Sequence, residues 1–332
     1  MKKLINDPYE FVDETIEGIL LAHGDHFKRC EGSDRALMRA DGPVEGKVAI
    51  VTGGGSGHIP IFIGYVGPGL CDAVSIGNVF SSPSPDDMLA ATKAAHGGAG
   101  VLYLYGNYSG DVMNFGMAAE MAAMEDIEVA TVLAKDDVSS APVEQMEDRR
   151  AVAGLFFAYR IAGARAEEGG SLDEVVEAAE EAVFNTRSMG VALTPCTIPA
   201  AGEPTFELGE EEMEIGMGIH GEPGVRRGPI MPADDVVDEM LEHVLGDLPF
   251  ESGDEVAVLV NSLGATPPEE LYVMYRRVHQ VLGEAGIEIY RSFIGEYATS
   301  LEMAGASVSL LRLEGELKRL LDAEAHSPLV RL

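Results

Sequence analysis

Short apolar runs separated by longer amphipathic stretches constrain the fold of this chain more than any other feature of its sequence. Residues 48–51 and 101–105 are apolar runs of strand length, and a third run follows at 128–133. Helical spacing of apolar residues then appears at 155–165 and 172–188. Such alternation is typical of α/β proteins, in which helices cover the faces of a sheet. We predict an α/β fold of two α/β domains, with mainly parallel or mixed sheets flanked by helices.

A boundary between the two domains is expected near residue 188, where the long helical pattern ends and the alternation begins again. The first domain would span residues 1–188 and the second residues 189–332. The elements expected in the second domain are strands at 191–193, 256–260, 288–293 and 308–313, and helices at 268–282 and 314–321.

Two helix starts in the first domain carry clear capping signals. Ser84 precedes Pro85, which places a hydroxyl at the N-cap and a proline at the first helical position. Ser171 is followed three residues later by Glu174, which is the spacing of a capping box. We therefore predict helices that begin directly after Ser84 and Ser171.

Composition restricts the class of protein. Hydrophobic residues make up 46% of the 332, which is enough for packed cores and argues against a disordered chain. No apolar run approaches the roughly 18 residues of a membrane helix, and the N-terminal residues lack a signal-peptide core. We predict a cytoplasmic protein without a membrane segment. The three cysteines have neither disulfide nor metal-site spacing, so reduced thiols are expected.

The net charge of −33 makes nucleic-acid binding improbable, because phosphate backbones attract the opposite sign. The acidic side chains are compatible either with an acidic partner-binding surface or with adaptation of the whole protein to high salt. They are spread through nearly every segment, which favours the halophilic interpretation, in which salt screens their mutual repulsion.

The first candidate site follows the apolar run at 48–51, where we expect a glycine-rich loop over residues 53–58 that ends at His58. Glycines let a backbone approach a ligand closely, although a tight strand-to-helix turn has the same composition. The segment matches neither a Walker A loop nor a clean dinucleotide fingerprint, and no other segment predicts a nucleotide site. His58 points more firmly to function, because an imidazole among polar and glycine positions seldom fills a core.

Asp111 is expected at the start of the helix that follows residues 101–105. An aspartate at this place can simply cap the helix and complement its dipole. It can also accept a proton from a substrate hydroxyl. The two roles conflict, because stabilisation by the helix end would lower the pKa of the carboxyl and weaken the base.

His220 differs from histidines such as His243 and His279, which lie in helical patterns as expected surface residues. Glycines flank His220 on both sides, so its ring should be reachable and the backbone free to fold around a small ligand. With the acidic neighbour Glu222, this favours a functional histidine. No cluster of histidines and cysteines has ligand spacing, so we predict no metal in this chain.

Taken together, these segments resemble the K subunit of dihydroxyacetone kinase. The resemblance covers nearly the whole chain and rests on many motifs in the same order. They are residues 2–7, 52–58, 80–86, 107–115, 196–202, 216–224 and 261–267. The resemblance implies a phosphotransferase that acts on an alcohol group, built as a homodimer of two α/β domains.

The resemblance also implies roles for the candidate residues. His220 would attack the ketone carbon of the substrate and hold it as a hemiaminal, which selects carbonyl sugars over glycerol. Asp111 would be the base on the terminal hydroxyl, and His58 would orient the substrate by a hydrogen bond. Backbone and hydroxyl contacts to the sugar are expected from Gly54, Gly55 and Ser56.

The resemblance assigns the nucleotide to a partner, so no cofactor is expected in this chain. ADP or ATP with magnesium would lie on a separate L subunit. A phosphotransferase-system protein that recharges ADP, or ATP directly, would then supply the phosphoryl group.

Two departures from the family pattern bear on the substrate. Ile59 stands where the family has glutamate, and Gly106 where it has a substrate-contacting lysine. Both resemble the branch that phosphorylates erythrulose or apulose, and a glycine at 106 could admit a larger ketose. The predicted substrate class therefore comprises dihydroxyacetone and four- or five-carbon ketoses.

Two rival functions come from other classes. A non-catalytic relative that binds the ketose and co-activates transcription could keep the covalent histidine and lose the acid/base pair. His58 and Asp111 are both present, which favours the enzyme. A dinucleotide-dependent oxidoreductase, suggested by the glycine run, fails on motif spacing.

Overall fold

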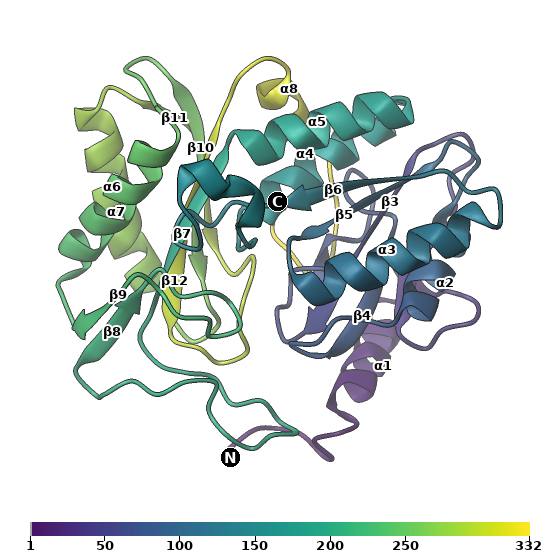
Figure 1. The fold of residues 1–332 in the computed structure, drawn as a ribbon, viewed down its shortest axis with the longest axis horizontal. Helices are drawn as coiled ribbons and strands as arrows, with labels where there is room; N and C mark the ends of the chain where they lie inside the picture. Colours follow the sequence, from purple (N-terminus) through teal and green to yellow (C-terminus); the bar gives the residue numbers. More distant parts are fainter. Residues whose placement is uncertain (1) are drawn as a thin grey trace.

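Two six-stranded sheets with helices packed against them make up the computed structural model, which describes residues 2–332 (Figure 1). Met1, the start of the N-terminal segment considered above, lies outside the described residues. Among residues 2–332, no helix combines the length and the apolar character needed to cross a membrane. The predicted α/β class, with mixed sheets flanked by helices, is confirmed.

The first sheet has a parallel centre and an antiparallel edge. Its strands are β1 (Phe27–Arg29), β2 (Ala36–Arg39), β3 (Ala49–Ser56), β4 (Ala73–Val79), β5 (Val101–Gly106) and β6 (Val129–Ala134), in the order β1-β2-β4-β3-β5-β6. The neighbours from β4 to β6 are parallel, whereas β1 and β2 run antiparallel. All six residues of β5 are buried, which explains its uninterrupted apolar sequence.

The helices of this half are α1 (Phe11–His23), α2 (Pro85–Ala95), α3 (Ser109–Ala123), α4 (Leu155–Glu167) and α5 (Leu172–Phe184), with 3-10 turns at Ile63–Tyr65 and Val143–Asp148. Two of them, α2 and α5, begin where the capping signals predicted. The Ser84 side chain accepts a hydrogen bond from the Asp87 N–H, and Ser171 forms both bonds of its capping box with Glu174. The prediction that the last helix runs to residue 188 was wrong, because α5 ends at Phe184.

The second sheet is mainly antiparallel. It contains β7 (Thr186–Ala192), β8 (Glu212–Ile215), β9 (Arg226–Pro229), β10 (Glu255–Ser262), β11 (Glu288–Gly295) and β12 (Gly305–Arg312), in the order β11-β10-β12-β7-β8-β9. Only the β10–β11 pairing among the described residues of this sheet is parallel. The remaining helices are α6 (Ala233–Asp247), α7 (Pro268–Glu284) and α8 (Leu317–Leu321). Figure 1 shows α6 and α7 together on the outer side of this sheet.

Helix α4 joins the two halves into one core. Phe156 of α4 packs on Phe293 of β11, with ring centroids 4.8 Å apart, and on Tyr297, at 5.0 Å. The same apolar cluster takes in Leu317 and Leu320 of α8, so the C-terminal helix contacts α4 and α5. Residue 188 lies inside β7 of the second sheet. The division of the chain into residues 1–188 and 189–332 stays a prediction.

The glycine run predicted as a loop is strand instead, because β3 continues through Ser56. Glycine is disfavoured in strands, but here two neighbouring segments come too close for a side chain. A Cβ on Gly55 would stand 2.6 Å from the backbone nitrogen of Ser81, and one on Gly54 would stand 2.2 Å from the Phe62 ring. The strand ends at Ser56, and the next residue, Gly57, has a φ of +104° that favours glycine.

Candidate functional site

His58 follows the end of β3 and is buried, with 1% of its surface exposed. Its Nδ1 lies 2.7 Å from the carbonyl oxygen of Thr299, and a carbonyl oxygen only accepts, so Nδ1 carries the hydrogen. Burial, followed by the charge of His220, lowers the pKa of His58 to about 3. The neutral ring therefore presents a lone pair on Nε2, which is buried and has no hydrogen-bond partner within residues 2–332.

Three aromatic rings surround the His220 ring and come from three different segments. His58 meets it edge-on with centroids 4.8 Å apart, Tyr108 at 4.7 Å and Phe80 at 5.3 Å. Phe80 also stacks on His58 at 4.7 Å. The Tyr108 hydroxyl donates to the Ala151 carbonyl at 2.6 Å, which fixes this wall of the site. The structure thus brings His58 and His220, 162 positions apart in the printed sequence, into ring contact.

His220 lies in the turn between β8 and β9, and Glu222 of the same turn accepts two hydrogen bonds from it. One Glu222 oxygen lies 2.9 Å from Nδ1 of His220, and the other accepts the His220 backbone N–H, also at 2.9 Å. Burial opposes ionisation of Glu222, but the His220 hydrogen bond and the nearby charges lower the pKa of this carboxyl to about 2. An ionised carboxylate only accepts, so Nδ1 is the donor and the neutral ring has its lone pair on Nε2.

Asp111 is the third residue of α3 and does not cap it. Helix α3 has Tyr108 at the N-cap position without a side-chain cap, and Asp111 instead accepts a hydrogen bond from the Ser82 hydroxyl. Burial raises the pKa of Asp111 to about 6, although Ser82 and His220 act in the other direction. The expectation that this pKa is lowered was therefore wrong, because burial outweighs the Ser82 hydrogen bond and the charge of His220.

The remaining predicted positions lie in the strands β3 and β5. Gly54, Gly55 and Ser56 lie in β3, and Ser56 is buried. Gly106 is the buried last residue of β5, where a Cβ would stand 3.1 Å from Ala151 and 3.2 Å from the Tyr108 ring. Direct contact of these residues with a sugar stays a prediction.

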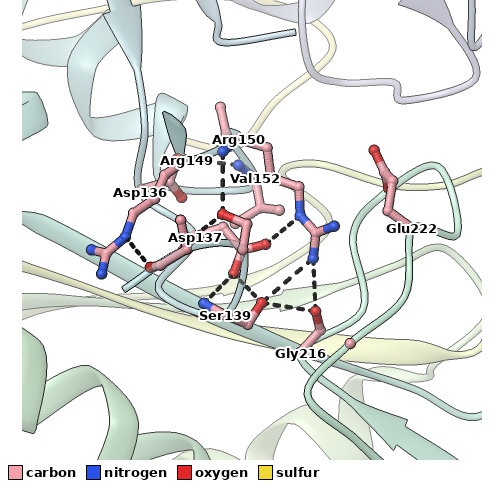
Figure 2. A network of polar contacts seen from close by, with 12 residues as sticks. Asp136, Asp137, Ser139, Arg149, Arg150, Val152, Gly216 and Glu222 are labelled. Atoms are coloured by element: carbon pink, nitrogen blue, oxygen red, sulfur yellow. Dashed lines mark hydrogen bonds and ion pairs between the residues drawn. The ribbon is translucent and has the colours of Figure 1, made fainter. Parts of the chain in front are cut away.

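A largely buried polar network contacts the start of the turn that carries His220 (Figure 2). Arg150 donates to the Asp137 carboxylate at 2.6 Å and to the carbonyl of Gly216 at 2.8 Å. The Ser139 hydroxyl donates to the same carbonyl, also at 2.8 Å. Figure 2 shows the Arg150 guanidinium between Asp137 and Glu222. The segment before α4 is therefore tied to the start of the turn that carries His220.

A family model, the Dak1 domain, matches residues 17–329 of this sequence. The chain belongs to the Dak1 family. The resemblance to the dihydroxyacetone kinase K subunit is thereby confirmed as membership of a family whose model spans most of the chain.

Relatives of this Dak1 chain include two kinds of kinase. It is 48% identical to a PTS-dependent dihydroxyacetone kinase 2, dihydroxyacetone-binding subunit DhaK, from Listeria innocua, over 99% of this chain and 98% of the relative. It is 42% identical to an L-erythrulose kinase from Pectobacterium atrosepticum, over 100% of this chain but 56% of that protein. The solved structure of the dihydroxyacetone kinase operon co-activator Dha-DhaQ aligns with a TM-score of 0.88 at 30% identity, covering 94% of this chain and 96% of that one.

Several side chains of the Dak1 site escaped the sequence analysis. Phe80 and Tyr108 lie in motifs of the family resemblance but were given no role, and Thr299 lies in none of these motifs. All three contact one of the two histidines. Arg150 escaped because its partners are distant in sequence. A signal was present, since Arg149 and Arg150 are adjacent in a chain with 23 basic residues against 56 acidic ones.

Proposed function

We propose that this chain is the substrate-binding subunit of a kinase for short-chain ketoses and that His220 holds the ketone covalently. The observation that carries the proposal is the pairing of Nδ1 of His220 with an ionised Glu222, because it leaves Nε2 as a free nucleophile. About 24% of the His220 side chain is exposed, so a small molecule can reach the ring. The names of the Listeria and Pectobacterium relatives support a ketose as the substrate.

The covalent step needs no group beyond those of the site and solvent. The Nε2 lone pair of His220 forms a bond to the ketone carbon, and the π electrons of the carbonyl move to its oxygen. That oxygen takes a proton from solvent, which leaves a positive charge on the imidazole. The Glu222 carboxylate stabilises this charge through Nδ1–H, and loss of the Nδ1 proton to solvent gives the neutral hemiaminal. Glycerol has no carbonyl carbon and is excluded.

His58 and Asp111 would then act on the hydroxyl groups of the bound ketose. The unpartnered Nε2 of His58 accepts a hydrogen bond from a substrate hydroxyl and orients it. Asp111, with a pKa of about 6, is ionised at neutral pH and accepts the proton of the terminal hydroxyl as its oxygen attacks phosphorus. The nucleotide leaves with the electron pair of the broken bond.

The phosphoryl donor belongs to a separate L subunit in this proposal, with ADP or ATP and magnesium bound there. Support comes from the Listeria relative, which is named as one subunit of a PTS-dependent kinase. Among residues 2–332, no group of three histidine, cysteine, aspartate or glutamate residues is placed to hold a metal ion.

The proposed substrates are dihydroxyacetone, erythrulose and apulose. Gly106 places no cationic side chain at the position of the family's lysine, but Ala151 and the Tyr108 ring occupy the space beside it, so this position alone adds no room for a larger ketose. The erythrulose kinase relative supports the same class.

A second candidate is a ketose-binding co-activator without catalytic activity, which the likeness to the Dha-DhaQ structure favours. The two functions differ at Asp111. A binding protein needs no base there, whereas a kinase subunit requires one whose pKa suits proton transfer near neutral pH.

Homodimer formation, a cytoplasmic location and adaptation to high salt complete the proposal. The first two rest on the resemblance. The third rests on the net charge of −33, which predicts greater stability as added salt screens repulsion.

Native mass spectrometry of the intact protein after separate incubation with dihydroxyacetone, erythrulose, apulose and glycerol tests the covalent step. We expect an adduct of one ketose mass with at least one ketose and none with glycerol. His220→Ala should abolish the adduct, whereas His243→Ala, on the exposed face of α6, should keep it. Absence of an adduct with every ketose would exclude the covalent role of His220.

A further inference from the structure

The Glu222 carboxylate that orients His220 has a cationic neighbour of its own. An ideal Cβ on Gly218 would stand 2.3 Å from Oε2 of Glu222 and 2.9 Å from Cζ of Arg150. The two charged groups are therefore close neighbours across the bare backbone of Gly218. The charge of Arg150 is one of the causes that lower the pKa of Glu222.

Arg150 is held in place independently of Glu222. Its Nε donates to Asp137, whose side chain is 1% exposed, and its Nη2 donates to the carbonyl of Gly216. Asp137 also accepts the Ser139 backbone N–H at 3.0 Å. Because Asp137 is fixed from several sides, the guanidinium has little freedom to follow Glu222 if the latter moves.

We propose that Arg150, anchored by Asp137, is a positioning residue that keeps the Glu222 carboxylate against Nδ1 of His220 and so fixes the tautomer whose Nε2 is free. The inference rests on the proposed function of His220. The side-chain hydrogen bonds of Arg150 among the described residues go to Asp137, Ser139 and Gly216 and not to His220, so it acts through Glu222.

The physical reason is the distribution of charge around the turn. Without Arg150, two carboxylates, Asp137 and Glu222, would share a largely buried region without a positive charge. About 31% of the Glu222 side chain is exposed, so it can relieve this repulsion by turning toward solvent. Nδ1 of His220 would then lose its acceptor and the ring would exchange between its two tautomers.

The other titratable groups that face His220 do not replace Glu222. His58, from the end of β3, and Tyr108, from the start of α3, pack against the ring in T-shaped arrangements, and their side-chain hydrogen bonds go to backbone carbonyls instead of Nδ1. The charge of His220 lowers the pKa of Asp111 on α3, but the Asp111 carboxylate accepts its hydrogen bond from the Ser82 hydroxyl and not from Nδ1. Glu222 alone among the described groups accepts from Nδ1, so the tautomer depends on its position.

Nitrogen-15 NMR of the histidine rings in the ketose-free protein tests the inference. The His220 signals are assigned by their loss in His220→Ala. We expect the Nδ1–H tautomer in the wild type, and a mixture of tautomers in Arg150→Met and in Glu222→Gln. Arg150→Lys restores the charge and should recover most of the wild-type spectrum. Arg277→Met, which removes a partly exposed arginine of α7 that pairs with Asp238 of α6, is the matched control and should change nothing.

The rate of ketose adduct formation supplies a second readout. We expect Arg150→Met to slow it about tenfold and Arg150→Lys about threefold or less, which corresponds to one lost hydrogen bond. Asp137→Asn keeps the shape of the anchor and decides the question if Arg150→Met fails to fold; it should shift the tautomers in the same direction. A wild-type spectrum in folded Arg150→Met or Asp137→Asn would overturn the inference. A tautomer shift without an adduct in any variant, wild type included, would instead overturn the proposed function alone.

Discussion

The two histidines of the site touch each other, yet their surroundings give them opposite properties. His58 donates Nδ1–H to the neutral Thr299 carbonyl. Burial, followed by the charge of His220, lowers its pKa to about 3 despite that hydrogen bond, so the ring stays uncharged. His220 is partly exposed and donates Nδ1–H to the Glu222 carboxylate, which can stabilise a positive ring. The comparison teaches that burial makes one imidazole a fixed acceptor, while a charged partner makes the other a nucleophile that can carry charge.

The largest expected effect is on the rate of phosphoryl transfer, for which Asp111 is needed and which is distinct from the covalent capture at His220. Asp111→Asn should lower phosphoryl transfer by about 10²- to 10⁴-fold, because the base on the hydroxyl is lost. Adduct formation on His220 should remain near the wild-type rate. In the wild type, transfer should rise as the pH is raised through about 6, where Asp111 loses its proton. A coupled assay with a purified L-type kinase subunit and mass spectrometry of the same samples measures both quantities.

Asn at position 111 keeps the size of the side chain, so its thermal unfolding midpoint serves as the control for folding. Equal transfer rates in the wild type and Asp111→Asn would favour the co-activator function over the kinase. A parallel loss of the adduct would show instead that Asp111 takes part in binding.

The next effect tests whether His58 is only an acceptor. His58→Gln should still form the adduct but about tenfold more slowly, because one oriented hydrogen bond to the substrate is lost. The same incubation that gives no adduct with His220→Ala should therefore give a slow one here. Time-resolved mass spectrometry distinguishes the two. Complete loss in His58→Gln would contradict the assignment of different roles to the two rings.

A smaller change acts on the His220 side of the comparison without replacing a charged residue. Gly218→Ala places a methyl group 2.3 Å from Oε2 of Glu222 and should push that carboxylate off Nδ1. We expect adduct formation to slow by several-fold up to about tenfold, the range of one lost hydrogen bond. The matched control is Gly283→Ala in α7, where no atom lies within 4 Å of the added methyl. A wild-type rate in Gly218→Ala would show that Glu222 can shift without consequence.

The sequence predicted those parts of the fold that depend on local composition. The fully buried strand β5 appeared as an apolar run, and the caps at Ser84 and Ser171 marked two helix starts correctly. The glycine run was misassigned, because its strand conformation depends on contacts with Phe62 and Ser81 that local sequence does not contain.

The candidate site was predictable in its residues but not in its electrostatics. His58 and His220 stood out by their glycine neighbours, whereas the raised pKa of Asp111 depends on burial that only the fold produces. Arg150 and Glu222 come together through a hydrogen bond of Arg150 to Gly216, 66 positions away, so no local pattern could reveal their proximity.

The smallest effect is on stability, where the burial of His58 should appear as a dependence on pH. Its pKa is near 6.5 in an unfolded chain and about 3 here, so between these values the unfolded state binds more protons. The contribution of His58 to the free energy of unfolding is therefore fully present above about pH 6.5 and is lost as the pH falls. His58→Gln should flatten this loss of stability, while His243→Gln should leave it unchanged.

The contribution of Asp111 to stability has the opposite sign, because its raised pKa makes the folded state bind more protons between about 3.8 and 6. Urea unfolding of the His58→Gln, Asp111→Asn and double variants across this range separates the two slopes, and an unaltered slope in His58→Gln would mean that its buried ring already accepts a proton in the folded protein.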